Sequence, residues 1–212
     1  MRKVFYSLVG GAALCASGCV SVLPAAAPPS ARFTIAAVDF SSPAEQQVAW
    51  SLAIADPSAT RAYDTTKIAL THSQGQIEYY ASGEWADRAP ILVSTVLQRS
   101  FENSGSILSI GDAISLPGAD YFLQTDIRSL HVEYDNQQGK RERSTAKLEF
   151  YVRLADRRGR ILAAHRFIQS EPLTDDSETA AARAFDTAMS RMLNEILPWT
   201  IEAASAASQK TN

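Results

Sequence analysis

Cysteine is scarce in this chain of 212 residues, and both cysteines, Cys15 and Cys19, lie close to the first residue. Neither a disulfide framework nor a cysteine-based metal site can therefore form in the remaining sequence. An excess of positive charge is also lacking, because 20 lysines and arginines stand against 23 aspartates and glutamates. Without a surplus of basic residues to neutralise phosphates, nucleic-acid binding is not expected.

Catalytic and nucleotide-binding motifs are missing as well. The chain has no GxSxG, GxGxxG or P-loop pattern, and its three histidines, His72, His131 and His165, lack the spacing of a zinc hydrolase. Ser144 and Lys147 match SxxK, but they fall in a strand pattern, where residues three apart face opposite sides. We therefore expect no enzyme, no metal site and no cofactor. The alternative, a secreted hydrolase, would depend on His72, His131 or Ser144.

The first residues have the features of a signal segment. Arg2 and Lys3 precede the apolar run Val4–Leu14, which is too short to cross a membrane as a helix. A plain secretory signal with cleavage near residues 25–27 is one interpretation. The sequence Ala16-Ser17-Gly18-Cys19 favours another, because it resembles a bacterial lipobox.

A lipobox predicts that residues 1–18 are removed and that Cys19 becomes lipidated, with palmitate among its acyl chains. Val20 follows Cys19, where an aspartate would retain a lipoprotein at the inner membrane, so the outer membrane is favoured. Residues 19–31 are rich in proline and small side chains, which favours an extended, flexible tether. About 12 residues at roughly 3.3 Å each would reach about 40 Å.

The remaining pattern predicts a single α/β (α+β) domain over residues 32–202, with a mainly antiparallel sheet and two principal amphipathic helices packed on it. Short alternating or β-branched runs bounded by turn residues predict strands at 32–40, 48–55, 66–70, 76–81, 107–110, 119–134, 144–155 and 160–170. Within 119–134 the apolar phase changes after Ile127, which predicts a bulge.

Two segments repeat apolar residues at helical spacing. The first, residues 85–103, is expected to begin at Asp87 and to stop at Gly105. Its predicted buried face consists of Ala89, Leu92, Val93, Val96, Leu97 and Phe101. The second is expected to begin at Asp175 or Asp176 and to kink or end at Pro198. Residues 203–212 are expected to form a frayed C-terminal tail.

Aromatic residues gather just before the first predicted helix, at Tyr79, Tyr80 and Trp85. They could pack in the core, or they could form an exposed surface that contacts a partner protein. We take these three residues as candidate partner contacts, and core packing stays open as the alternative.

The same region resembles the ABC-type transport auxiliary lipoproteins, also described as PqiC-like. The similarity begins with Asp64–Leu70 and Ile77–Ala81 and continues with the WADRAP sequence of Trp85–Pro90, which leads into a helix. Further matches follow in the family's order at Gly118–Tyr121, Ile161–Ala163, Phe167, Ala184–Asp186 and Trp199. The resemblance covers about residues 33–202.

The resemblance implies a non-enzymatic lipoprotein that is anchored in the outer membrane and faces the periplasm. It implies partnership with an MCE-domain protein, an ABC permease and an ATPase that together move phospholipid or a related lipid between two membranes. Docking to the MCE channel at the outer membrane and a homo-oligomeric ring are further implications. The alternative is a structural or assembly lipoprotein of another envelope complex, which would share the anchor and tether but not the family motifs.

Overall fold

The computed structural model describes residues 30–40, 47–72, 75–134 and 144–211. Within these ranges the chain forms nine strands and two helices: β1 (Ala31–Phe33), β2 (Val48–Ile54), β3 (Ser58–Ala59), β4 (Lys67–His72), β5 (Gln76–Trp85), α1 (Ala89–Asn103), β6 (Ile107–Asp112), β7 (Tyr121–Tyr134), β8 (Thr145–Asp156), β9 (Ile161–Pro172) and α2 (Glu178–Thr211). The predicted signal segment 1–18, Cys19 and most of the tether lie outside the described residues and stay predictions.

Strand β7 lies at the centre of the sheet. One edge pairs antiparallel with β8, from Tyr121 opposite Asp156 to Glu133 opposite Thr145. The other edge is shared by three parallel strands, with β2 at its beginning, β3 at its middle and β4 at its end. The pairs β8–β9 and β4–β5 are antiparallel, whereas β1–β5 and β2–β6 are parallel. The prediction of a mainly antiparallel sheet is confirmed, since the longest ladders of this mixed sheet are antiparallel.

Buried and more exposed side chains alternate along β7 and β8, and the buried ones form the core face of the sheet. The buried residues from these strands that alternate along this face are Leu123, Thr125, Ile127, Leu130, Val132, Ala146, Leu148, Phe150, Val152 and Leu154. Between Ile127 and Ser129 the pairing register shifts and Arg128 becomes exposed. This β-bulge moves the buried positions from odd to even numbers, as the apolar phase predicted.

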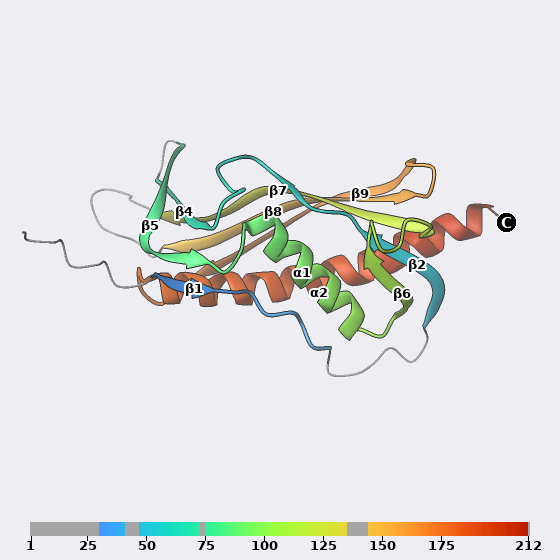
Figure 1. The fold of residues 1–212 in the computed structure, drawn as a ribbon, viewed down its shortest axis with the longest axis horizontal. Coiled ribbons are helices and arrows are strands. Elements are labelled where there is room, and N and C mark those ends of the chain that lie inside the picture. The colour runs from blue at the N-terminus through green and yellow to red at the C-terminus, as the bar shows by residue number, and fades with distance from the viewer. Residues whose placement is uncertain (1–29, 41–46, 73–74, 135–143, 212) are drawn as a thin grey trace, which may run out of the picture.

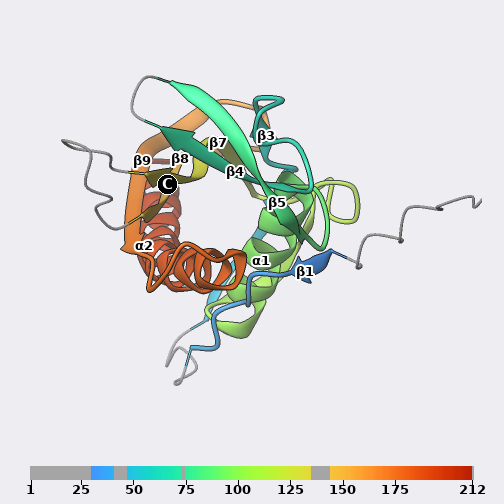
Figure 2. The same ribbon diagram turned by 90° about the vertical axis from the view of Figure 1, so that its left-hand side faces the viewer.

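Both helices cover the same face of the curved sheet and lie beside each other (Figure 2). Helix α1 contacts β2 and β6, and it buries the six residues that the periodicity predicted. Helix α2 packs across β8 and β9. Its buried face includes Ala181, Phe185, Ala188, Met189, Met192, Leu193, Ile196, Thr200 and Ala204. The two predicted amphipathic helices are therefore confirmed.

The helix starts differ from the predicted ones. Helix α1 begins at Ala89, and its N-cap residue, Arg88, makes no side-chain cap; Asp87 accepts only the Arg88 backbone N–H. At α2 the Ser177 hydroxyl accepts the Ala180 N–H at 3.1 Å, so Ser177 is the cap rather than Asp175 or Asp176. Asp175, Asp176 and Ser177 are all favourable N-cap residues. The path of the short connection between β9 and α2 determines that the last of them caps the helix.

The end of α2 and the first strand also differ from expectation. Helix α2 does not end at Pro198, and the segment expected to be a frayed tail is helical as far as Thr211. Burial explains the continuation: Ala204 is fully buried, and its carbonyl accepts the Tyr121 hydroxyl at 3.2 Å. The first strand is much shorter than predicted, since only Ala31–Phe33 pairs with another strand.

The molecule is elongated and its two ends differ (Figure 1). At one end lie β1, the β4–β5 hairpin and the beginning of α2. At the other lie the β8–β9 turn and the end of α2. With 34 residues, α2 is roughly 50 Å long and runs between these ends.

Side-chain truncation on β5 should cost more stability at a buried residue than at an exposed one. We expect Trp85→Ala to lower the free energy of unfolding by about 3 to 5 kcal/mol, because Trp85 is fully enclosed and its loss leaves a cavity. Ile77→Ala on the same strand is the control, and it should cost less than about 1 kcal/mol because Ile77 is exposed. Urea unfolding measures both, and similar losses for the two variants would contradict the assignment.

Candidate functional site

The three predicted partner contacts do not share one environment. Tyr79 is exposed and Tyr80 is half-buried. Trp85 is only 1% exposed, and its ring packs edge-on against Phe185 of α2, with centroids 5.3 Å apart. The prediction that Trp85 contacts a partner was wrong, since its side chain is part of the core.

A shift in pairing register explains this difference. Lys67 pairs with Glu84 and Ala69 pairs with Tyr79, so two steps along β4 correspond to five steps along β5. The three extra residues of β5 form an irregularity that turns the strand over. Tyr79 and Trp85 have the same parity in the sequence, yet they emerge on opposite faces of the sheet.

The part of β5 that carries Tyr79 forms an accessible edge. Among the described residues, β1 covers the outer edge of β5 only from Gly83 to Trp85. Ile77 and Tyr79 are exposed on the uncovered part. Tyr79 is held there by a 3.3 Å bond from its hydroxyl to the Ala62 carbonyl. An uncovered strand edge with exposed apolar side chains is a surface on which another chain can dock.

The residues of the hydrolase alternative do not form a catalytic group. His131 stacks on Tyr63, and its Nδ1 lies 3.0 Å from the Tyr63 hydroxyl; burial lowers the pKa of His131. The Ser144 hydroxyl donates to Asp176 at 2.6 Å, whereas Lys147 pairs with Glu133 on the other face of the sheet. Ser144 and Lys147 therefore point apart, as the strand pattern predicted.

The described ranges contain neither a cluster of metal-ligating side chains nor a membrane-spanning helix. No three histidine, aspartate or glutamate side chains in them approach closely enough to hold a metal ion. Neither helix in these ranges combines the length and apolar character that a membrane span requires.

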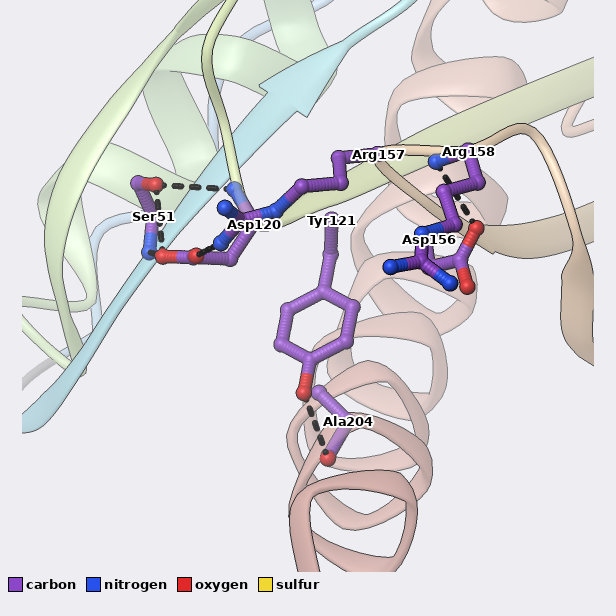
Figure 3. A network of polar contacts seen from close by, with 7 residues as sticks. All are labelled: Ser51, Asp120, Tyr121, Asp156, Arg157, Arg158 and Ala204. Atoms are coloured by element: carbon purple, nitrogen blue, oxygen red, sulfur yellow. Dashed lines mark hydrogen bonds and ion pairs between the residues drawn. The ribbon is translucent and has the colours of Figure 1, made fainter. Parts of the chain in front are cut away.

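A cleft of about 760 Å³ opens at the other end of the molecule, beside the last turns of α2. Its walls come from the first residues of β7, the β8–β9 turn and α2 (Figure 3). Besides Tyr121 and Ser208, the lining residues divide into a charged group, Asp120, Asp156, Arg157, Arg158 and Arg160, and an apolar group, Leu162, Ala163, Ala203, Ala206 and Ala207. The cleft is therefore amphiphilic.

Asp120 ties the start of β7 to β2 at the edge of the cleft. Its carboxylate accepts the backbone N–H and the hydroxyl of Ser51 at 3.1 and 3.0 Å, and the Ser51 hydroxyl accepts the Asp120 N–H at 3.0 Å. Arg157 reaches across from the β8–β9 turn and pairs with the same carboxylate (Figure 3). These contacts, led by the Ser51 backbone N–H, lower the pKa of Asp120.

Asp156 organises the β8–β9 turn. Its carboxylate accepts the backbone N–H groups of Arg158 and Arg160, both at 2.9 Å, and the Arg160 guanidinium at 3.1 Å. The Arg160 N–H makes the largest contribution to lowering the pKa of Asp156. Gly159, with φ of 77°, occupies the left-handed position that this tight turn requires. Asp156 is thus fully occupied by the turn.

Tyr121 also lines the cleft, together with Asp120 and Asp156. Its hydroxyl points to the carbonyl of Ala204 (Figure 3), and the edge of Trp50 packs against its ring, with centroids 5.2 Å apart. Since this hydroxyl is occupied within the fold, Tyr121 offers mainly its apolar ring to the cleft. Burial raises the pKa of Tyr121.

Sequence reasoning did not find this cleft. In the sequence, residues 156–159 only separate two predicted strands and 203–212 only form an expected tail, and no pattern indicates that the two segments are close in space. One local signal was present, because three arginines within the four residues 157–160 exceed what a tight turn needs.

The bonds of the Asp120 carboxylate to Ser51 and Arg157 lead to a prediction about the pH dependence of stability. We expect Asp120→Asn to lower the free energy of unfolding by about 1 kcal/mol at pH 7, because it weakens charge-assisted bonds of a carboxylate that is 37% exposed. A lowered carboxyl pKa adds stability above its unfolded-state value of 3.8, and this is lost as the pH falls through the folded-state pKa. Wild type and variant should therefore converge in acid.

Unfolding in urea at pH 7 and at about pH 2.5 measures this difference. Asp56→Asn is the matched control, since Asp56 is exposed, and it should change stability little at either pH. A pH-independent cost of Asp120→Asn would contradict the role assigned to the carboxylate charge.

Comparison with known proteins places the fold among solved structures. The crystal structure of protein XCC0632 from Xanthomonas campestris has a TM-score of 0.71 and 28% identity, covering 85% of this chain and 97% of that one. Another crystal structure, of an uncharacterized protein, has a TM-score of 0.62 and 11% identity, over 81% of this chain and 98% of that one, and it shows similarity of fold alone.

Sequence comparison adds a relative and a family. An uncharacterized protein of Bradyrhizobium diazoefficiens is 31% identical over 161 residues, which is 76% of this chain. The chain spans 42% of the length of that relative. The family model described as the ABC-type transport auxiliary lipoprotein component matches residues 33–197, from β1 to the second half of α2. The chain therefore belongs to the family of ABC-type transport auxiliary lipoprotein components.

Proposed function

We propose that this chain is a non-enzymatic outer-membrane lipoprotein that serves as the auxiliary component of an ABC-type MCE system for intermembrane phospholipid transport. In this role it docks the MCE channel at the outer membrane from the periplasmic side. The observation that carries the proposal is the family match over residues 33–197. The absence of a P-loop from the sequence agrees with an ATPase and a permease that are separate subunits.

The proposed anchor is a lipid on Cys19, which lies outside the described residues. The described chain enters the domain at β1, where Phe33 pairs with Trp85 of β5. This point lies beside the beginning of α2, because a Cβ at the neighbouring Gly83 would meet the Glu178 side chain at 2.6 Å. The anchor therefore leads into the end of the molecule that also carries the β4–β5 hairpin (Figure 1).

The proposed contact with the MCE channel is the uncovered edge of β5. Tyr79 and Ile77 are exposed there, and Tyr80, half-buried behind them, supports the strand. Burial, with the nearby Tyr134 hydroxyl as the next cause, raises the pKa of Tyr80, so it stays neutral at physiological pH. We also propose that copies of the domain assemble into a homo-oligomeric ring, the arrangement that the family resemblance implies.

The proposed anchor gives a prediction about localisation. We expect Cys19→Ala to move the protein from the outer-membrane fraction to another fraction, because the acyl chains supply the membrane affinity. Fractionation on a sucrose gradient, with metabolic labelling by a palmitate analogue, measures the change. Cys15→Ala is the matched control and should leave both labelling and fractionation unchanged. Labelling that persists in Cys19→Ala would contradict the assigned lipidation site.

The proposed partner surface gives a prediction about crosslinking. A photoreactive amino acid at position 79, activated in intact cells, should crosslink an MCE-domain protein, because an uncovered strand edge is accessible. The control position is Ile161, which is similarly exposed but is the first residue of β9, next to the β8–β9 turn at the opposite end of the molecule. Crosslinked partners are purified through a C-terminal tag and identified by mass spectrometry.

Three other results are informative. Equal crosslinking from positions 79 and 161 would contradict the assignment to the β5 edge. Recovery of outer-membrane assembly factors without an MCE protein or permease would favour the alternative, a structural or assembly lipoprotein of another envelope complex. A light-scattering mass equal to one chain for the purified protein would contradict the ring.

A further inference from the structure

We propose that the cleft at the end of α2 binds one anionic amphiphile, a molecule with a phosphate or carboxylate headgroup and an apolar chain. The inference goes beyond the proposed function, which concerns the opposite end of the molecule and a protein partner. It depends on the charges, shape and lining of the cleft, and not on the identity of the transport system.

The charged side of the cleft has one positive charge in excess. Arg157 is paired with Asp120, and Arg160 is paired with Asp156. In the part of the chain that the structure describes, no carboxylate forms an ion pair with the Arg158 guanidinium. The carboxylates of the cleft are also occupied by backbone N–H groups, so neither is free to turn toward Arg158. A ligand with one negative charge would complete the balance.

The opposite side of the cleft is apolar and consists mainly of small side chains. Ala203, Ala206 and Ala207 are spaced three and four residues apart, so they lie on one face of α2. Each carries only a methyl group, which leaves open the space that a larger side chain would fill. Leu162 and Ala163, at the start of β9, extend this surface. An apolar chain lying there would be removed from water, which is favourable.

The volume fits such a ligand better than a small ion. A phosphate group alone would fill only a small part of about 760 Å³ and would leave the alanine wall in contact with water. Volumes in the range of 300 to about 1,000 Å³ are typical of sites for small organic molecules, in which apolar walls are combined with a few oriented polar groups. The Tyr121 and Ser208 hydroxyls donate to backbone carbonyls, and both aspartates are engaged. The charged group left for the ligand is therefore the Arg158 guanidinium.

The location of the cleft also separates it from the membrane anchor. It lies at residues 203–207 of α2, whereas the tether enters beside Glu178, about 40 Å away along the helix axis. A ligand here is therefore distinct from the acyl chains proposed on Cys19.

Isothermal titration with monomeric dodecyl phosphate tests the proposal. The mature chain, residues 19–212, carries Cys19→Ser so that no acyl chain competes for the cleft. We expect binding of one molecule per chain. Inorganic phosphate, which lacks the chain, and dodecyl maltoside, which lacks the charge, should each bind at least about tenfold more weakly.

Two variants locate the site. Arg158→Gln should raise the Kd for dodecyl phosphate about tenfold, and leave that for dodecyl maltoside unchanged, because a charged hydrogen bond is lost. Ala206→Leu should weaken both amphiphiles, because an exposed position on the apolar wall becomes bulkier. The matched control is Arg183→Gln, an exposed arginine near the beginning of α2, which should change neither Kd more than about twofold.

Each other outcome overturns the proposal in a distinct way. Equal affinity for dodecyl phosphate and dodecyl maltoside would mean that the cleft does not recognise charge. Equal affinity for dodecyl phosphate and inorganic phosphate would mean a simple anion site. Equal effects of Arg158→Gln and Arg183→Gln would place the ligand elsewhere. None of these results alters the crosslinking test of the β5 edge, so the two proposals fail independently.

Discussion

The pairing of β7 on both edges is the constraint on which the rest of the molecule depends. Because β8 occupies one edge from end to end, β2, β3 and β4 must share the other edge in sequence. This arrangement places the start of β7 beside β2 and the end of β7 beside β4. The cleft forms at the first of these places, where Asp120 bonds to Ser51. The uncovered edge of β5, which follows β4, forms at the second.

The sequence predicted the elements whose residues carry their own pattern. Helix α1, the alternation of β8 and the bulge near Arg128 all follow from the spacing of apolar residues, which tertiary contacts preserve. The burial of Trp85 was not predictable in this way. Three extra residues in β5 turn the side chain of Trp85 to the other face of the sheet, and only the pairing of β5 with β4 reveals these extra residues. Likewise Asp175, Asp176 and Ser177 are equivalent caps until the exit from β9 is known.

The end of α2 and the cleft were missed for a related reason. A run of small residues suggests a loose tail, but alanine is the best helix former, and Ala204 is held by a hydroxyl from a strand 83 residues earlier. The cleft combines residues near 120, 157–160 and 203–207, which no local pattern associates. Its arginines could be noticed in the sequence, whereas their excess over the available carboxylates became visible only in three dimensions.

The shared edge of β7 also determines the order in which the chain can fold. Strands β7, β8 and β9 are consecutive antiparallel neighbours with short-range contacts, so they can pair rapidly with one another. Strands β2 and β4 are made earlier, yet about 50 to 70 residues separate them from the strand they require. The edges of β2 and β4 that face β7 must therefore stay unpaired until residues 121–134 arrive, although β6 and β5 can already occupy their other edges. During this interval the N-terminal half is the part that chaperones would have to protect.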